Sequence, residues 1–431
     1  MRIVKFRAEK LFGRFDYEIN LDPPSGNTII TAPNGYGKST ILRILQNFAS
    51  GDYYYFIREN YSIIEFTFSE GHPLTIYKTL EDKSKQMVSF SRGSKFAKLG
   101  DPFEDNIDES IYFIERELNF LTRIGYTTWK HDVSGEILER HEVLARYGGK
   151  SNLRHRFRAI DWVEDLRAQL SIYSIPTNRL KEGENPSAHS SMVTLIARDI
   201  AELIKDTIRN QFKIGREKET SFPARIIDSL KSGEAPSEDS IKESIAAVQH
   251  HESRYKRLGL LPKDSSTTHL SNQTEISDYA TRVVLKTYLD DIHHKFSELA
   301  PVANKLEVFT KSINSLFAFT TAWPSADGGI VIRAKDGEKD PLSLAALSSG
   351  EQHLLVILGK LVFKTEPGSL VLIDEPEISF HPEWQEKFLD ILESIREING
   401  FSTVVATHSP MVIGHRWDDT VELAELYTQH S

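Results

Sequence analysis

Between an apolar strand and a helix, the chain reads Ala32-Pro33-Asn34-Gly35-Tyr36-Gly37-Lys38-Ser39-Thr40. The run Asn27 to Thr31 before it predicts a strand, and the spacing of apolar residues after it predicts a helix. Glycine at positions 35 and 37 lets backbone N–H groups face an anion, and the start of a helix adds a favourable dipole. A strand, a glycine-rich turn and a helix in this order predict a phosphate-binding loop in an α/β protein.

The polar residues of this loop predict a nucleotide with a divalent cation. In such loops the lysine, here Lys38, contacts the β- and γ-phosphates, and the next hydroxyl, here Ser39, ligates Mg²⁺. Ala32 stands where the pattern usually begins with glycine, and its methyl group changes the space inside the turn. We expect ATP and Mg²⁺ as ligands, with the nucleotide bound by Asn34, Gly35, Tyr36, Gly37, Lys38, Ser39 and Thr40.

A second motif, Leu370-Val371-Leu372-Ile373-Asp374-Glu375-Pro376, is an apolar strand that ends in two carboxylates. Such a continuous apolar run is typical of a strand buried on both faces, and open α/β sheets bind ligands at the carboxyl ends of their strands. Asp374 is predicted to hold Mg²⁺ through water, and Glu375 to orient or deprotonate the attacking water as a catalytic residue. The alternative is a solvated acidic turn.

A third motif, Leu347-Ser348-Ser349-Gly350-Glu351-Gln352, contains the capping-box pattern from Ser348 to Glu351, so a helix is expected to begin there. A helix N-terminus attracts an anion, and none is expected beside it in its own subunit. Ser348 and Gly350, with Ser349 and Glu351 of the same motif, are therefore candidates to bind the γ-phosphate of ATP held by a second copy. This predicts a homodimer with the nucleotide sandwiched between the subunits.

The fourth motif is Ala406-Thr407-His408-Ser409. His408 follows a predicted strand, Thr403 to Ala406, and Ser409-Pro410 predicts a helix start. A lone histidine would be interpreted as structural. In this order of motifs, His408 is interpreted as a catalytic residue that hydrogen-bonds the γ-phosphate.

Together these motifs resemble the ABC-type ATPases of the branch that includes structural-maintenance-of-chromosomes (SMC) proteins, Rad50, RecF and the overcoming-lysogenization-defect nucleases. The resemblance implies an α/β fold: an ABC-ATPase head with a mixed sheet, an antiparallel β subdomain and a P-loop NTPase core, plus a helical insertion. In this branch a glutamine often touches Mg²⁺ and the γ-phosphate. Thr177-Asn178-Arg179-Leu180 occupies the corresponding place, so Asn178, one methylene shorter, is a candidate nucleotide ligand.

The stretches LSSGEQ, DEPEISFHPEWQ and ATHSP resemble most the stand-alone bacterial ATPases of antiphage systems, such as the ATPase subunits of Septu and PARIS. This resemblance covers residues 1–80 and 305–420. In the insertion it extends only to the general type of segment and not to the sequence. It implies an ATPase that controls a separate nuclease or toxin effector. The chain has 23 residues after His408, too few for a nuclease domain, so the effector is expected on another chain.

The resemblance and the motif spacing divide the chain into three parts. Residues 1–180 are expected to form the N-terminal lobe, 181–304 a helical insertion, and 305–431 the C-terminal lobe. The segment Lys181 to Ser191 is interpreted as a linker or hinge. Each helical pattern in the insertion spans about 20 residues or fewer. The insertion is therefore predicted to be a compact subdomain and not a long arm. A strand pattern is expected to return from Lys305, with Gly329 to Arg333 as a candidate strand.

The amino-acid composition excludes several classes of site and function. The chain has 431 residues, 39% of them hydrophobic, a net charge of -10 and no cysteine, so disulfides and thiolate metal sites are excluded. It shows no run long enough to span a membrane and no signal peptide, so a cytoplasmic protein is expected. Non-specific DNA binders usually carry a basic excess. Nucleic-acid contact would need a local patch such as Lys150 to Arg158, for which a solvated charged face is the alternative.

The motifs are compatible with four functions. A defence ATPase with a separate effector is implied by the resemblance. A DNA-repair or DNA-tethering ATPase like Rad50 or RecF is the main alternative, against which the acidic balance and the expected short insertion count. The 309 positions between Lys38 and Leu347 argue against a transporter subunit. The short C-terminal segment argues against a self-contained nuclease.

Overall fold

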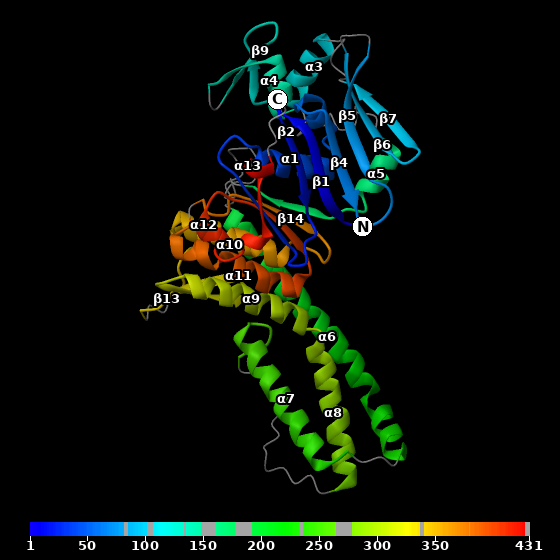
Figure 1. Cartoon of the computed structure of the whole chain (residues 1–431). Coiled ribbons are helices and arrows are strands. Elements are labelled where there is room, and N and C mark those ends of the chain that lie inside the picture. The colour runs from blue at the N-terminus through cyan, green and yellow to red at the C-terminus, as the bar shows by residue number, and fades with distance from the viewer. Residues whose placement is uncertain are drawn as a thin grey trace.

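The computed structural model describes residues 1–81, 85–100, 107–132, 135–147, 160–176, 192–232, 236–263, 278–336, 340–378 and 380–426. A head of sheets and helices holds most of the chain, and three helices extend from it as an arm (Figure 1). The predicted fold class, an α/β head with an antiparallel subdomain and a helical insertion, is confirmed by the sheet topology.

A five-stranded sheet lies at the centre of the head. Its order is β11-β14-β15-β3-β16, and every pairing in it is parallel. The strands are β3 (Asn27–Thr31), β11 (Ile172–Ile175), β14 (Leu370–Asp374), β15 (Ser402–Ala406) and β16 (Thr420–Glu422). Because β3 pairs with β15, the strand before the phosphate loop lies beside strands that the chain adds more than 330 residues later. Parallel pairing brings all their carboxyl ends to one edge.

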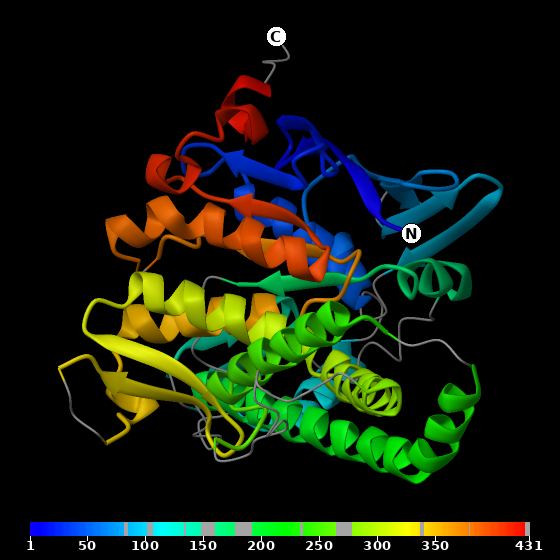
Figure 2. The same cartoon turned by 90° about the horizontal axis from the view of Figure 1, so that it is seen from below.

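The central sheet separates two hydrophobic cores. Leu372 and Val404 face one core, whereas Val371 and Val405 face the other, as expected for strands buried on both faces. The first core includes α1 (Lys38–Ser50), and the second includes α9 (Ala300–Leu316), α10 (Ser349–Phe363) and α11 (Pro382–Asn399). The three helices form a layer under the sheet (Figure 2).

An antiparallel sheet, ordered β2-β1-β4-β5-β6-β7, covers the first core. Its strands are β1 (Ile3–Leu11), β2 (Phe15–Asn20), β4 (Ile63–Phe68), β5 (Leu74–Glu81), β6 (Lys85–Arg92) and β7 (Lys95–Gly100). In β4 buried residues alternate with half-buried ones, and Phe66 stacks on Phe48 of α1 with ring centroids 4.7 Å apart.

A small subdomain follows. Its elements are α3 (Ile107–Glu117), β8 (Leu121–Arg123), β9 (Thr128–His131), β10 (Ile137–Glu139) and α4 (Arg140–Tyr147). Helices α2 (Tyr53–Arg58) and α5 (Asp161–Arg167) instead contact α1. The three strands pair antiparallel around the fully buried Trp129. The sequence did not predict this sheet, because strands of three or four residues are too short to show alternation.

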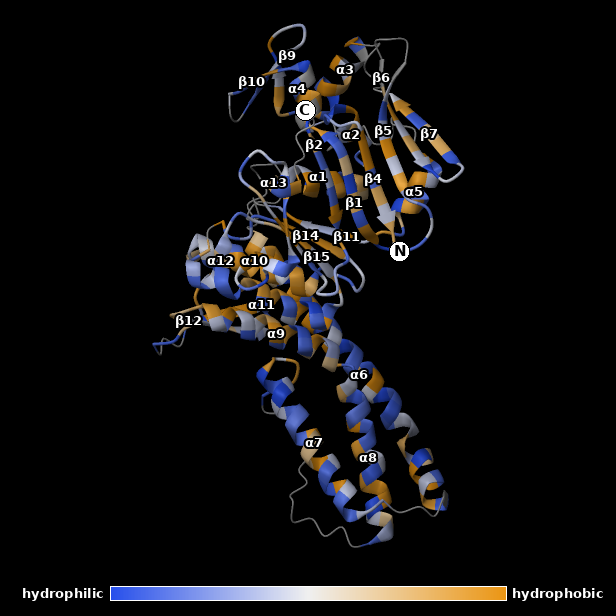
Figure 3. Cartoon of the chain, in the orientation of Figure 1, coloured by the Kyte–Doolittle hydropathy of each residue, from blue (hydrophilic) through white to orange (hydrophobic). Residues whose placement is uncertain are grey.

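The helical insertion forms a long arm, so the prediction of a compact subdomain was wrong. Helix α6 (Met192–Ser232) has 41 residues, which corresponds to about 60 Å. It runs with α7 (Glu238–Arg257) and α8 (Tyr279–Ser297), and α8 lies between the other two (Figure 1). Hydrophilic residues occupy much of the arm surface (Figure 3).

Contacts with α8 explain why α6 continues through Pro223, where a helix loses one hydrogen bond. Before the proline, Glu219 pairs with Lys295 at 3.1 Å. After it, the guanidinium of Arg225 donates two hydrogen bonds to the buried carboxylate of Asp291, with N–O distances of 2.5 and 2.6 Å. These cross-links hold both sides of the proline on the same partner helix.

The strand pattern was expected too early at Lys305, because this segment belongs to α9, whereas the candidate strand Gly329 to Arg333 is confirmed as β13 (Gly329–Ala334). Buried Leu306, Phe309, Ile313 and Leu316 follow helical spacing. The hairpin of β12 (Thr320–Ser325) and β13 (Gly329–Ala334) comes next. Short elements complete the C-terminal lobe: η3 (Leu344–Ala346), α12 (Pro410–Ile413), η4 (Trp417–Asp419) and α13 (Leu423–Leu426). None of the helices in the described ranges is long and apolar enough to cross a membrane.

Candidate functional site

The phosphate loop lies between β3 and the first residue of α1. Gly35 and Gly37 have φ angles of 91° and 88°, the left-handed region that favours glycine. Lys38 is buried, and its Nζ donates hydrogen bonds to the carbonyl oxygens of Ala32 at 2.6 Å and Pro33 at 3.4 Å. The lysine therefore closes the loop on itself, with its charge held at the start of a helix where anions bind.

The turn between β1 and β2 supports this loop. Phe12, at the left-handed φ of 56°, lies so close to Gly37 that a Cβ there would be 3.1 Å from its ring. Phe15 contacts the Tyr36 ring at 5.4 Å between centroids, and the hydroxyl of Tyr17 donates to the Tyr36 carbonyl at 2.8 Å. The antiparallel sheet thus holds the loop from one side.

Two of the predicted metal ligands meet. The hydroxyl of Ser39 donates to Oδ1 of Asp374 at 3.0 Å, although the residues are 335 positions apart. A hydroxyl and a carboxylate are the oxygen donors that Mg²⁺ prefers, so the residues present fit that ion. The pair lies at the carboxyl edge of the central sheet, between the end of β14 and the start of α1.

Glu375 follows directly and has an unusual backbone. Its φ of 46° is left-handed, a conformation that costs about 1–3 kcal/mol for a residue with a side chain. Its N–H donates to the carbonyl of Ala406 at 2.9 Å, which continues the pairing of β14 with β15. Strain of this kind concentrates at functional sites, and here it places the predicted base beside Asp374.

His408 lies next to Glu375, and a second carboxylate that was not predicted lies closer. The ring Nδ1 of His408 is 3.1 Å from Oε1 of Glu377 and 3.9 Å from Oε1 of Glu375. The same Oε1 of Glu377 accepts hydrogen bonds from the Thr407 hydroxyl at 2.8 Å and the His408 N–H at 3.0 Å. The sequence did not predict this contact, because it depends on the adjacency of β14 and β15 in the sheet. The one signal in the sequence was a second glutamate two positions after Glu375.

The third motif forms the predicted helix start. Ser348 caps α10 through a capping box, in which its hydroxyl accepts from the Glu351 N–H and its own N–H donates to the Glu351 carboxylate. Ser348 and Ser349 are exposed, and Gly350 is half-buried. No hydrogen bond or ion pair recorded among the described residues joins this motif to the phosphate loop of the same chain.

Three sequence interpretations fall on residues outside the described ranges. They are Asn178 as a nucleotide ligand, residues 181–191 as a linker or hinge, and the basic run 150–158. The role of Asn178 stays a prediction.

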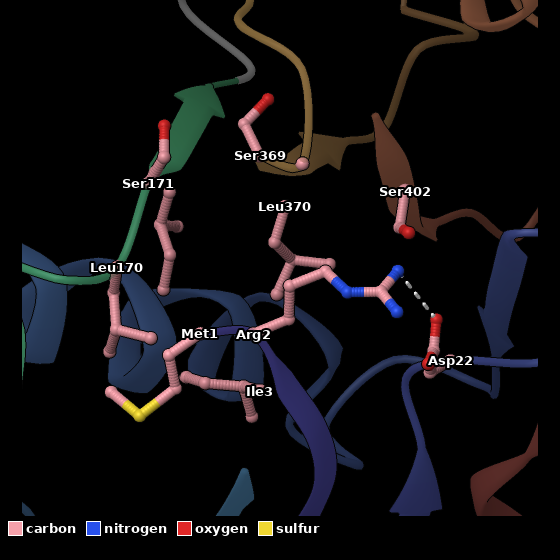
Figure 4. A pocket seen from close by; sticks show the side chains of 11 residues that line it. Met1, Arg2, Ile3, Asp22, Leu170, Ser171, Ser369, Leu370 and Ser402 are labelled. Atoms are coloured by element: carbon pink, nitrogen blue, oxygen red, sulfur yellow. Dashed lines mark hydrogen bonds and ion pairs between the residues drawn. The ribbon is translucent and has the colours of Figure 1, made fainter. Parts of the chain in front are cut away.

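A small pocket lies at the opposite edge of the central sheet, among the amino ends of its strands (Figure 4). Ser171, Ser369, Leu370 and Ser402 line it together with the first residues of the chain. Its volume of about 10 Å³ holds one water at most. It is therefore no second nucleotide site.

Comparison with protein families matches residues 197–414, just over half of the chain, to the family described as "AAA domain, putative AbiEii toxin, Type IV TA system". The chain belongs to this family. The matched range runs from α6 to the end of α12, and the phosphate loop precedes it. The chain is therefore an AAA-type ATPase with a P-loop nucleotide-binding site, and the structure places that loop against the matched range.

Other comparisons are more distant. A segment of 70 residues, 16% of the chain, is 37% identical to protein ea59 of Escherichia phage lambda and spans only 13% of that protein. The SMC head domain of Thermotoga maritima is 13% identical, with a TM-score of 0.31 over 96% of this chain and 91% of that one. The Smc head of Pyrococcus furiosus, bound to the C-terminal domain of ScpA, is 13% identical, with a TM-score of 0.33 over 98% and 93%.

Proposed function

We propose that the chain binds ATP with Mg²⁺ at the carboxyl edge of the central sheet and hydrolyses the γ-phosphate. The observation that carries this proposal is the contact between Ser39 and Asp374, which joins two motifs 335 positions apart. A P-loop hydroxyl beside the last acid of a buried strand is the pair that holds Mg²⁺ in P-loop NTPases.

Each residue has a distinct task in this proposal. The loop N–H groups and Lys38 bind the phosphates, and Lys38 exchanges its two loop carbonyls for phosphate oxygens. Ser39 and Asp374 would hold Mg²⁺, which supplies charge neutralisation of the phosphates. Glu375 orients or deprotonates the attacking water, and His408 contacts the γ-phosphate.

A second copy completes the site. The exposed N-terminus of α10, with Ser348 and Gly350, carries partial positive charge that its own subunit does not use on a phosphate. Two chains facing one another supply this terminus to each other's ATP. The proposed active species is therefore a homodimer with two sandwiched nucleotides.

Calorimetry tests the binding step. We expect Lys38→Ala to abolish ATP binding, because the variant loses the cation at the loop. Lys5→Ala is a matched control, since Lys5 forms an exposed pair with Glu18 on the antiparallel sheet. Unchanged affinity in the Lys38 variant would refute the phosphate-loop assignment.

We further propose that the ATPase acts in the cytoplasm as a sensor or regulator of a separate nuclease or toxin effector in bacterial antiphage defence. The family description names a toxin and a toxin–antitoxin system, which supports a system of two proteins. The resemblance of the three C-terminal motifs to antiphage ATPases is the second support.

A DNA-repair or DNA-tethering ATPase remains the alternative function. The argument from a short insertion no longer counts against it, because α6 alone has 41 residues. The net charge of -10 still does. Stimulation of hydrolysis by DNA with a steep salt dependence would favour this alternative.

A pull-down from the native host separates the two functions. The tagged chain, captured with ATP and Mg²⁺, is analysed by native mass spectrometry. A stoichiometric second protein with nuclease or toxin activity supports the defence function. A homodimer that carries only DNA contradicts it and supports the alternative.

A further inference from the structure

We propose that Glu377 is a positioning residue: it holds the His408 ring by Nδ1, fixes the ring proton on that nitrogen, and leaves Nε2 for the nucleotide site. The consequence for hydrolysis rests on the proposed function. The geometry itself is testable without ATP.

A tight turn brings Glu377 under the end of β15. After the left-handed Glu375, the N–H of Ile378 donates to the Glu375 carbonyl at 3.2 Å, and the N–H of Phe380 donates to the Glu377 carbonyl at 2.9 Å. The turn reverses the chain and leaves the Glu377 side chain only 7% exposed. Its carboxylate thereby reaches the loop that follows β15.

One carboxylate oxygen organises that loop. Oε1 of Glu377 lies 2.8 Å from the Thr407 hydroxyl, 3.0 Å from the His408 amide nitrogen and 3.1 Å from His408 Nδ1. A carboxylate accepts hydrogen bonds, and the Thr407 hydroxyl and the His408 amide donate to this oxygen. Nδ1 lies 3.1 Å from the same oxygen and can engage it only as a donor, so the proposal places the proton of a neutral His408 ring on Nδ1. The partner of one ring nitrogen sets the state of the other, as in histidines that bind metals or act in triads.

The other oxygen points to a role for the charge. Oε2 of Glu377 is buried and has no hydrogen-bond partner among the residues that the structure describes. Leaving a buried acceptor without a partner is unfavourable for stability. A carboxylate at this position is therefore not explained by stability alone, whereas its contact with His408 gives it a role.

Glu377 also keeps His408 off the proposed base. Oε1 of Glu375 is 3.9 Å from the same Nδ1, so it is the next carboxylate that the ring can reach. If His408 donated to Glu375, it would compete with the attacking water for that carboxylate. Holding Nδ1 on Glu377 separates the two tasks.

Nitrogen NMR of histidine-labelled protein, recorded without nucleotide at mildly alkaline pH, tests the geometry. The His408 signal is assigned by its loss in His408→Ala. We expect the Nδ1–H form in the wild type and in Glu375→Ala, and its loss in the Glu375→Ala/Glu377→Ala double variant. Thr407→Val, which removes another donor from the same oxygen, should retain it. An Nε2–H ring in the wild type, or an Nδ1–H ring in the double variant, would overturn the proposal.

Steady-state kinetics tests the consequence. Glu377→Ala should lower kcat by about 10²-fold, the effect of misplacing a catalytic group by roughly 1 Å, with little change in KM for ATP. In a His408→Ala background the same substitution should have no further effect on kcat, because Glu377 acts through that ring. A full additional loss there would identify a merely structural role. A wild type that hydrolyses no ATP would refute the proposed function and leave the NMR result to decide this inference.

Discussion

Replacing Gly37 by alanine adds a methyl group to a strained and crowded position, and we expect ATP to bind at least roughly 30-fold more weakly. The left-handed backbone, with φ of 88°, costs a residue with a Cβ about 1–2 kcal/mol. The Cβ would also lie 3.1 Å from a ring carbon of Phe12, and overpacking of this kind costs about 1–3 kcal/mol. The sum is about 2–5 kcal/mol, and 1.4 kcal/mol corresponds to a tenfold change in affinity.

We expect the added methyl group to weaken ATP binding, because a loop without nucleotide can shift to accommodate it. A loop whose N–H groups bind phosphates cannot shift in this way. Calorimetry of Gly37→Ala and of Gly37→Ala/Phe12→Ala separates the two contributions. Removing the Phe12 ring should restore affinity about fivefold or more relative to Gly37→Ala, with Phe12→Ala alone as reference. The backbone strain should remain.

Gly35→Ala is the matched control for this rescue. Gly35 has nearly the same strain, with φ of 91°, but a Cβ there would meet no atom of the described residues within 4 Å apart from its chain neighbours. Phe12→Ala should therefore not rescue Gly35→Ala. Equal rescue of both variants, or wild-type affinity in Gly37→Ala, would refute the reasoning about this loop.

The remaining predictions concern the dimer and the arm. Ser348→Arg should leave ATP binding intact but block hydrolysis, and mixing it with Lys38→Ala should restore part of the activity, because one composite site is then intact. Burial and the charges of neighbouring side chains lower the pKa of His251, which favours its neutral ring in the folded chain. The unfolded chain binds that proton more readily, so the thermal midpoint should fall as the pH drops below about 6.5, and less so in His251→Gln. Asp291→Asn should destabilise the arm by about 1–3 kcal/mol because its charged partner is partly buried, whereas the exposed Asp290→Asn should cost at most about 0.5 kcal/mol.

Each of these has a direct readout. No recovery of ATPase activity in the mixture of variants would contradict the assignment of Ser348 to the partner's nucleotide. An identical pH dependence in His251→Gln would show that other groups control the arm. Hydrogen exchange along α6 beyond the proline reports the arm, and equal effects of the two aspartate variants would contradict the contribution assigned to the buried pair.

Local chemistry made much of the site predictable. The glycine spacing of the phosphate loop, the capping box at Ser348 and the apolar strand before Asp374 each depend on residues within about ten positions, and the structure shows the expected turn, cap and strand. The order of the motifs then indicated that they meet. The contact between Ser39 and Asp374 is the structural outcome of that inference.

The misses come from long-range packing. Pro223 removes one backbone hydrogen bond from α6, but contacts of α6 with α8 keep the helix continuous on both sides of it. Glu377 carries no motif of its own, and its task depends on two strand ends that lie about 30 positions apart in the chain. Pattern reading also failed where elements are short, as in the three-stranded sheet around Trp129.

The most direct test of the account is the mass of Glu375→Gln with saturating ATP and Mg²⁺, measured by light scattering. This substitution removes the proposed base and leaves the phosphate loop unchanged, so bound ATP should persist. We predict a stable dimer of about twice the 49.1 kDa chain mass, which returns to monomer when Ser348→Arg is added. A monomer under these conditions, with ATP shown to be bound, would contradict a nucleotide shared between two subunits.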